Sequence, residues 1–332
     1  MSLRQPYLLF LGDAPDMLAA KVALGVKQWR PEACLGQLSM PGCKADLGLA
    51  EMSVGYAVSA GARTLLVGVA NRGGVVAPSW VAVLKAALEA GLDLAAGLHQ
   101  RLSDIPELAE TARARGRAIH DVRSPERPYP VGDGRKRSGK RLLPVGTDCS
   151  CGKMYTALAL EAALRARGRP ATFRATGQTG ILITGEGVPL DAVVADFISG
   201  AVETVSPDAP EDHWDLIEGQ GSLLHPSFAG VTLGLIHGAQ PDALVICHEP
   251  TRTHLRGLPH YPIPSLETVM EQCLTAARLT NPKARFAGAS INTHALDDAA
   301  AAACLAEIEA RLGLPAVDPV RTGVERIAEA LE

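Results

Sequence analysis

The strongest constraint on the fold of this chain is a short glycine-containing loop between a buried strand and a helix. Residues 142–145 are an apolar run of strand length, and residues 155–167 are an Ala/Leu-rich run of helical character. The loop between them has the spacing G-x-x-x-x-G-K, in which glycines turn backbone N–H groups towards an anion and the helix N-terminus adds its positive dipole end. The pattern predicts a phosphate-binding loop, with a simple glycine-rich turn as the alternative. The candidate phosphate contacts are Gly146, Thr147, Asp148, Cys149, Ser150, Cys151, Gly152, Lys153 and Met154.

The residue after the loop lysine departs from the usual motif. Phosphate loops that cleave nucleotides carry Ser or Thr there, because its hydroxyl binds the Mg²⁺ beside the phosphates. This chain has Met154, whose thioether does not bind a hard cation. Thr156 follows two residues later, on a different side of the first helical turn. The loop is therefore expected to hold a phosphate group that is not cleaved.

Composition excludes several classes of function. The formal net charge of −4 and the pI near 6.2 give no field that would attract nucleic acid or an anionic membrane. No apolar run reaches the roughly 20 residues that span a bilayer, and the chain starts without the apolar core of a signal peptide. We therefore expect a cytoplasmic protein that acts on small molecules, binds neither nucleic acid nor membrane, and forms a homo-oligomer.

The seven cysteines predict neither a metal site nor a disulfide framework. Their number is odd and their spacing lacks the paired pattern of zinc ligands, as expected for reduced thiols in the cytosol. Cys149 and Cys151 are the one close pair, and small residues of this kind are often tolerated in a tight turn. Catalysis by either thiol is the less favoured alternative, and no metal requirement is expected.

Strand and helix patterns alternate along the whole chain. The first five strands are expected near residues 7–11, 33–38, 64–70, 93–97 and 118–122. Such alternation predicts an α/β protein with parallel, doubly wound sheets, whose ligands bind at the carboxyl ends of the strands. A chain of 332 residues is expected to form two domains. We assign a Rossmann-like N-terminal domain, a linker and a P-loop NTPase-like C-terminal domain to residues 1–125, 126–141 and 142–332.

The predicted linker is rich in proline, glycine and basic residues. Residues 132–141 contain five Lys or Arg side chains. A solvated run of charges is the favoured interpretation. Contact with a phosphorylated ligand between the domains is the alternative.

Three candidate site residues lie away from the phosphate loop, two of them in a loop and one in an expected helix. Arg72 and Gly73 follow a predicted strand, where an arginine can bind a carboxylate or phosphate in bidentate geometry, although a turn with a solvated arginine fits equally well. Asp196 stands in an apolar run that should form a buried helix. A buried carboxylate must be paired or functional, so Asp196 is either a catalytic candidate or a structural anchor.

A further group of candidates follows the strands expected beside the phosphate loop. One strand ends at Glu218, and the glycines on either side of Gln220 bring the backbone close to whatever that strand faces. In phosphate-loop folds a carboxylate at this place holds a metal or a reacting group. His225 is expected to line the same crevice. A second strand leads into residues 248–254, which contain His248 and Arg252. The spacing of the two histidines in this segment does not match a metal site, so proton transfer or hydrogen bonding is favoured over metal binding.

Several of these stretches resemble known families. The dethiobiotin-synthetase-like branch of phosphate-loop proteins is similar at residues 146–153, 218–222 and 292–293. A closer resemblance covers nearly the whole chain and points to the family of D-glutamate N-acetyltransferases, formerly a domain of unknown function. It is carried by residues 71–74, 146–154, 196–203 and 248–252. This resemblance implies a Rossmann-like and a phosphate-loop domain, and transfer of the acetyl group of acetyl-CoA to the amine of D-glutamate in D-amino-acid catabolism.

The implied chemistry is compatible with the candidate residues. Coenzyme A carries phosphates that are bound and not cleaved, so Met154 favours a transferase over a kinase. The protonated amine needs a base, and the developing oxyanion needs donors, such as loop N–H groups or Ser222. The candidate bases are Glu218, His225 and His248, with Asp196 as a further catalytic candidate. Arg72 and Arg252 are the proposed partners of the substrate carboxylates. Gly73 and Gln220 are further substrate-binding candidates.

Two other functions stay as alternatives. An ATP-dependent ligase or kinase of the dethiobiotin-synthetase type would use Lys153 and a Mg²⁺ ion held by Glu218, and Met154 counts against it. A non-enzymatic nucleotide sensor would close its domains on a ligand. The ionisable residues at several strand tips count against this third function.

Overall fold

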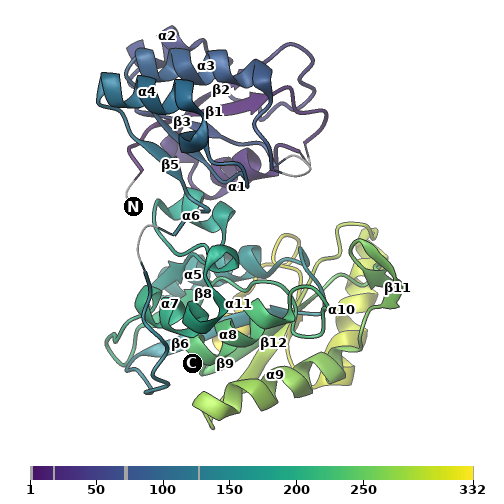
Figure 1. Cartoon of the computed structure of the whole chain (residues 1–332). Coiled ribbons are helices and arrows are strands. Elements are labelled where there is room, and N and C mark those ends of the chain that lie inside the picture. Colours follow the sequence, from purple (N-terminus) through teal and green to yellow (C-terminus); the bar gives the residue numbers. More distant parts are fainter. Residues whose placement is uncertain (1–2, 18, 71–73, 126–127, 332) are drawn as a thin grey trace. The chain divides into compact units, whose positions relative to one another are not determined.

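The computed structural model describes residues 3–17, 19–70, 74–125 and 128–331 (Figure 1). The chain forms two compact units, of which the first contains Met1–Glu126 and Gly177–Ala192 and the second contains the remainder. The sequence-based assignment had placed residues 177–192 in the C-terminal domain. In the structure this segment, with α6 (Gln178–Thr184), packs against α1 (Lys21–Trp29) of the first unit.

The first unit is built on a five-stranded parallel sheet with the order β2-β1-β3-β4-β5. All five predicted strands are present, which confirms the Rossmann-like prediction for this half. Strands β1, β3 and β4 are buried along their length, as expected for parallel strands covered on both faces. The elements are β1 (Tyr7–Gly12), α1, β2 (Cys34–Ser39), α2 (Val54–Ser59), β3 (Thr64–Val67), α3 (Pro78–Glu89), β4 (Asp93–Ala96), α4 (Pro106–Arg115) and β5 (Ile119–Asp121).

The turn after β1 is used for packing. The indole of Trp80 on α3 lies edge-on to Phe10 with ring centroids 5.6 Å apart, and its N–H donates to Asp13 Oδ1 at 3.0 Å. A Cβ on Gly12 would come within 2.9 Å of the same indole, and Gly12 has a φ of +52°. Glycine and aspartate at this strand end therefore support the core of the first unit.

The second unit is built on a six-stranded parallel sheet with the order β13-β12-β9-β6-β8-β7, and an antiparallel hairpin, β10-β11, is attached to it. Strand β6 lies between β8 and β9, so the carboxyl ends of these three strands are neighbours. Right-handed crossovers place α5 and α8 on opposite faces of the sheet. The elements are β6 (Lys140–Gly146), α5 (Lys153–Ala166), β7 (Ala171–Arg174), α7 (Ile198–Val205), β8 (Trp214–Ile217), α8 (Ala229–Ala239), β9 (Ala243–His248), β10 (His254–Leu255), β11 (Leu258–Pro262), α9 (Leu266–Thr280), β12 (Arg285–Ile291), α10 (Asp298–Leu312), β13 (Ala316–Val317) and α11 (Glu325–Glu329).

The basic segment before and at the start of β6 is anchored in the second unit. Arg137 and Arg141 are only 6% and 1% exposed, and burial lowers the pKa of Arg137 to about 10. Arg141 donates hydrogen bonds to Ser206 Oγ at 3.0 Å and to the carbonyl oxygen of Ser138 at 3.0 Å, and Ser206 in turn donates to Asp215. The favoured interpretation of a solvated charge run is therefore wrong for these two arginines.

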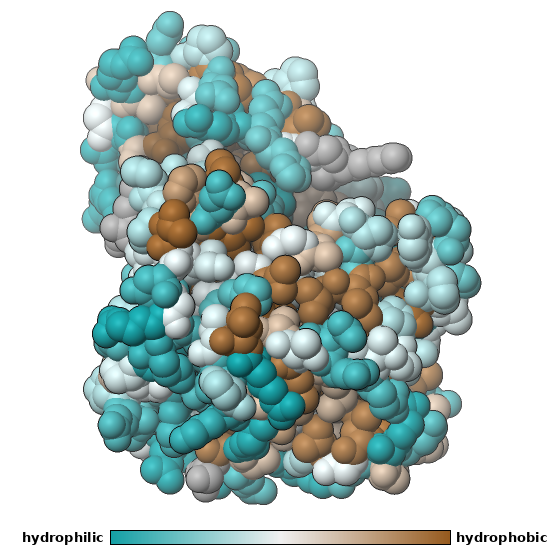
Figure 2. Space-filling view, turned by 60° about the horizontal axis from the view of Figure 1, so that its bottom comes forward, coloured by the Kyte–Doolittle hydropathy of each residue, from teal (hydrophilic) through white to brown (hydrophobic). Residues whose placement is uncertain are grey.

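Figure 2 shows hydrophobic residues gathered in the middle of the visible face of the second unit, with hydrophilic residues around them. Among the larger apolar side chains at the surface of the second unit are Leu233 on α8 and Leu279 on α9. None of the described helices combines the length and the apolar character needed to cross a membrane.

Candidate functional site

The phosphate loop joins β6 to α5 in the predicted order of strand, loop and helix. Ser150 and Gly152 have φ angles of +54° and +113°. Glycine adopts such a conformation freely, whereas a serine with positive φ is strained by roughly 1–3 kcal/mol and residues of this kind cluster at ligand sites. The loop backbone is therefore held in a form typical of a binding turn.

Of the two loop cysteines, Cys151 is buried and hydrogen-bonded within the protein, and Cys149 is half-buried. The Cys151 thiol donates to the carbonyl oxygens of Asp148 and Cys247 at 3.1 and 3.4 Å. A Cβ on Gly146 would come within 2.5 Å of its sulfur, so glycine leaves room for this thiol. Burial raises the pKa of Cys149, which disfavours the thiolate that a nucleophile or metal ligand needs.

Lys153 lies against its own loop. Its side chain is 6% exposed, and Nζ donates to the carbonyl oxygen of Asp148 at 2.8 Å. The hydroxyl of Thr156 faces the core, where it lies 3.0 Å from the carbonyl oxygen of Gly152 and 2.7 Å from Ser290 Oγ. The loop thus has a cation in place, while the nearest threonine on the helix is used for packing.

Asp148 ties the loop to the segment after β9. Its carboxylate is 1% exposed and accepts hydrogen bonds from the backbone N–H of Cys149 at 2.6 Å, Arg252 Nη1 at 2.6 Å and the backbone N–H of Arg256 at 2.8 Å. Burial lowers the pKa of Arg252, but its bond to Asp148 and the charges of Glu249 and Asp148 outweigh this and raise it. A buried carboxylate would be costly without such partners. The predicted substrate-binding Arg252 is therefore engaged within the protein.

Glu218 lies beside the loop, directly after β8. A Cβ on Gly219 would come within 1.9 Å of a carbonyl oxygen of β6 and 2.9 Å of Lys153 Cδ, so only glycine permits this approach. The Glu218 side chain is buried, and its Oε2 accepts from the backbone N–H of Thr176 at 2.9 Å. Gln220 donates to Thr176 Oγ1 at 3.1 Å. The structure thus brings the backbone directly after Glu218 to the loop and directs the side chains of both Glu218 and Gln220 towards Thr176.

His248 ends the strand on the other side of β6. Its Nδ1 lies 2.9 Å from Thr147 Oγ1 in the phosphate loop. Burial, with smaller contributions from the positive charges of Arg311 and Arg252, lowers the pKa of His248 to about 4. The ring is therefore neutral near pH 7 and keeps one lone pair.

His225 is buried next to the loop, with a side chain that is 2% exposed. Its Nδ1 accepts a hydrogen bond from the backbone N–H of Ser227 at 3.1 Å, so the neutral ring carries its proton on Nε2. This Nε2 is 3.9 Å from Asp148 Oδ1, and like Ser222 Oγ it has no hydrogen-bond partner in the part of the chain that the structure describes. The tautomer makes His225 a donor, whereas the predicted role of general base requires a free lone pair.

Within the described part of the chain, Asp148, Cys149 and His225 form the group that could hold a metal ion. Each offers one ligand atom, and these atoms lie within 4.8 Å of one another. A metal on Nε2 would require the ring to move its proton to Nδ1 and lose the hydrogen bond from Ser227. The observed tautomer suits an N–H donor better than a metal ligand.

The remaining predicted residues lie elsewhere. Asp196 is exposed in a short 3₁₀ turn, Ala195–Phe197, because α7 begins only at Ile198. The prediction that Asp196 is buried in a helix is therefore wrong. Because its carboxylate is exposed, it needs neither a buried partner nor a catalytic role to explain its charge. Arg72 and Gly73 lie outside the described residues.

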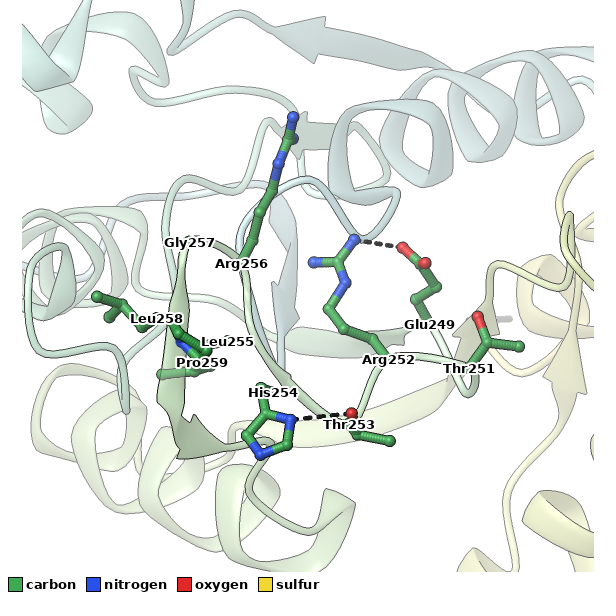
Figure 3. A pocket seen from close by; sticks show the side chains of 10 residues that line it. All are labelled: Glu249, Thr251, Arg252, Thr253, His254, Leu255, Arg256, Gly257, Leu258 and Pro259. Carbon is green, nitrogen blue, oxygen red and sulfur yellow. Dashed lines mark hydrogen bonds and ion pairs between the residues drawn. The ribbon is translucent and has the colours of Figure 1, made fainter.

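The segment after β9 forms an open pocket. Residues 249 and 251–259 line a cavity of about 620 Å³, which we call the hairpin pocket because it includes the turn between β10 and β11 (Figure 3). Arg252 is paired with Glu249, and the guanidinium of Arg256 extends on the same side of the segment. Sequence reasoning missed Arg256, although an arginine directly before a glycine in a short turn was a usable signal.

The comparisons with known proteins cover both units. Family models match residues 39–125 as the Rossmann-like N-terminal domain and residues 130–328 as the P-loop domain of DUF1611, a domain of unknown function. A D-glutamate N-acetyltransferase from Tritonibacter scottomollicae is 61% identical over 326 residues, which are 98% of each chain. One from Pseudoalteromonas sp. is 49% identical over 331 residues and covers 100% of each chain.

A solved structure gives the same result for the fold. The crystal structure of a DUF1611 family protein from Anabaena variabilis matches with a TM-score of 0.87 and 34% sequence identity, and the match covers 99% of each chain. This agreement confirms the prediction of an α/β protein with a Rossmann-like and a phosphate-loop half. The chain therefore belongs to the DUF1611 family, together with these two D-glutamate N-acetyltransferases.

Proposed function

We propose that this protein transfers the acetyl group of acetyl-CoA to the amino group of D-glutamate. The observation that carries the proposal is the full-length similarity, at 61% and 49% identity, to two D-glutamate N-acetyltransferases. The loop adds a chemical reason. Lys153 supplies a cation for phosphate, while Met154 stands where a Mg²⁺-binding hydroxyl belongs, which suits a donor whose phosphates are held throughout the reaction.

In this reaction the amine nitrogen attacks the thioester carbon, a C–N bond forms, the C–S bond breaks and coenzyme A leaves. The ammonium group must first lose a proton. Glu218 and His248 flank the phosphate loop from β8 and β9, the two neighbours of β6. We assign Glu218 as the proton acceptor because a carboxylate also attracts the ammonium group. With a pKa of about 4, His248 is a weak base and serves as a hydrogen-bond acceptor.

The developing oxyanion needs hydrogen-bond donors. The loop N–H groups are assigned to the phosphates of acetyl-CoA, which the pantetheine arm separates from the thioester, so the proposed donor is Ser222, whose buried hydroxyl has no hydrogen-bond partner among the described residues. Asp196, exposed on its turn, has no role in this scheme.

The test is release of free coenzyme A from acetyl-CoA by the purified protein. D-Glutamate should support thiol release, L-glutamate should not, and ATP with Mg²⁺ should yield no ADP. Formation of ADP without thiol release would replace the proposal with the ligase or kinase function.

The role of Glu218 has its own test. Glu218→Gln keeps the size of the side chain and an oxygen for the Thr176 N–H, and it should lower turnover by about 10²–10⁴-fold. Glu271→Gln, on the exposed face of α9, is the matched control and should leave turnover unchanged. Equal rates for Glu218→Gln and wild type would remove Glu218 from the role of base.

We also propose that the protein works in the cytoplasm as a homo-oligomer, without a metal, in the breakdown of D-amino acids. Light scattering should give a mass that is a multiple of 34.7 kDa. A monomer at micromolar concentration would contradict the oligomer.

A further inference from the structure

Arg252 has little capacity left for a ligand. Its Nη1 donates to Asp148 and to the carbonyl oxygen of Cys149, and its Nη2 pairs with Glu249. Three of the five N–H groups of a guanidinium are therefore used inside the protein. A substrate carboxylate would have to displace one of these partners, so the cation that binds it should be another residue of the hairpin pocket.

Arg256 is such a cation. It opens the two-residue turn that joins Leu255 of β10 to Leu258 of β11, and Gly257, the second turn residue, has a φ of +81°. The backbone N–H of Arg256 is fixed to Asp148 at 2.8 Å, so the turn is held against the phosphate loop. Its side chain is exposed, and its guanidinium forms no hydrogen bond or ion pair with any residue that the structure describes (Figure 3).

The charges of the hairpin pocket match an amino acid better than a polyphosphate. Glu249 contributes a carboxylate next to Arg252, and Arg256 adds a second positive charge on the same side of the segment. A polyphosphate would meet repulsion from Glu249, whereas an amino acid with a side-chain carboxylate brings a single small anionic group that Arg256 can bind on its own. The planar guanidinium of Arg256 can bind a carboxylate with two parallel hydrogen bonds.

We propose that the hairpin pocket binds the acceptor amino acid and that Arg256 is the specificity residue for its side-chain carboxylate. This inference rests on the proposed function and names the subsite in which the acceptor is recognised. Because the backbone N–H, and not the side chain, of Arg256 holds the turn on Asp148, substitutions of the side chain leave that link in place.

The test compares Arg256→Gln with wild type in coenzyme A release, with D-glutamate and acetyl-CoA varied separately. We expect KM for D-glutamate to rise about 10- to 100-fold and KM for acetyl-CoA to stay within about twofold. Arg256→Lys should fall between the two. The preference for D-glutamate over D-glutamine should largely disappear in Arg256→Gln. Lys283→Gln, which removes one exposed charge before β12 at the opposite edge of the sheet, is the control and should match wild type.

Each other outcome contradicts the inference. A rise in KM for acetyl-CoA alone would assign the guanidinium to a donor phosphate. Unchanged kinetics in Arg256→Gln, with active wild type, would overturn the subsite while leaving the proposed function intact. A wild-type protein without D-glutamate-dependent thiol release would overturn both.

Discussion

The two units contain parallel sheets of the same kind, but they use the residues after their strands in opposite ways. In the first unit Asp13, after β1, accepts the indole N–H of Trp80 and becomes part of the core. In the second unit the phosphate loop with Lys153 follows β6, Glu218 follows β8 and His248 ends β9, so these groups meet at one edge of the sheet. A parallel sheet offers a site at its carboxyl edge only where packing has not already used the polar groups there.

Among the tests of this contrast between the two sheets, the largest effect is expected at Lys153. Lys153→Met keeps the length of the side chain but removes the cation from the phosphate loop, and turnover should fall about 100-fold or more because a charge-assisted contact with phosphate is lost. Asp13→Asn keeps the acceptor for Trp80 in the other sheet, and its rate should stay within about twofold of wild type. Initial rates of thiol release measure both. A similar loss of turnover in Asp13→Asn would show that the residue after β1 in the first unit matters for catalysis as much as the phosphate loop of the second unit does.

The close approach of β8 to β6 is the next feature to test. Gly219→Ala puts a Cβ 1.9 Å from a carbonyl oxygen, so the free energy of unfolding should fall by about 2–4 kcal/mol. Gly230→Ala in α8, where a Cβ meets nothing within 4 Å, is the control and should raise it by about 0.5–1 kcal/mol. Urea unfolding measures both. Wild-type stability in Gly219→Ala would show that the backbone at Gly219 does not approach β6 this closely.

The buried state of His248 predicts a pH dependence of stability. Its pKa falls from the ordinary 6.5 to about 4 on folding, so between these values the unfolded chain binds more protons. The free energy of unfolding should therefore decrease as pH falls from 6.5 to 4. His248→Asn should show a shallower decrease in urea midpoints over this window, whereas His260→Asn on the exposed hairpin should follow wild type. Parallel curves for His248→Asn and wild type would place His248 in solvent.

The smallest effect is expected on removal of metal. The Nε2–H tautomer of His225 argues against a metal between Asp148 and Cys149, so dialysis against EDTA should leave the rate of thiol release unchanged. A loss of activity that a divalent cation restores would make these three residues a metal site and would require the opposite tautomer.

The sequence alone predicted the parts of the site that depend on local pattern and strand order. The residues of the phosphate loop are contiguous in the sequence, so the spacing of its glycines and lysine was enough to predict the conformation of the loop. Glu218 and His248 were predicted because the residues after neighbouring parallel strands meet at one edge, and the structure places both beside the loop.

Other parts depend on partners distant in the sequence and could not be predicted. Arg252 was predicted to be free to bind substrate, but in the structure it pairs with Asp148 and Glu249. The tautomer of His225 is set by one backbone N–H of Ser227, which no side-chain pattern reveals. Arg141 was predicted to be solvated because the sequence shows that it is charged. The sequence does not show which backbone carbonyl groups accept its hydrogen bonds.

The segment 177–192 has a consequence for how the protein is made. It lies downstream of β6, α5 and β7, yet it belongs to the first unit, and its Ile181, Leu182 and Ile183 are buried. During synthesis the N-terminal unit cannot complete its packing until residue 192 has left the ribosome, when β6, α5 and β7 have been made but β8, the strand that lies between β6 and β7, has not. A shortened gene that ends after the linker would leave an apolar surface uncovered, and one that begins there would carry an orphaned helix. No single division point in the sequence therefore yields two chains that each contain one whole unit.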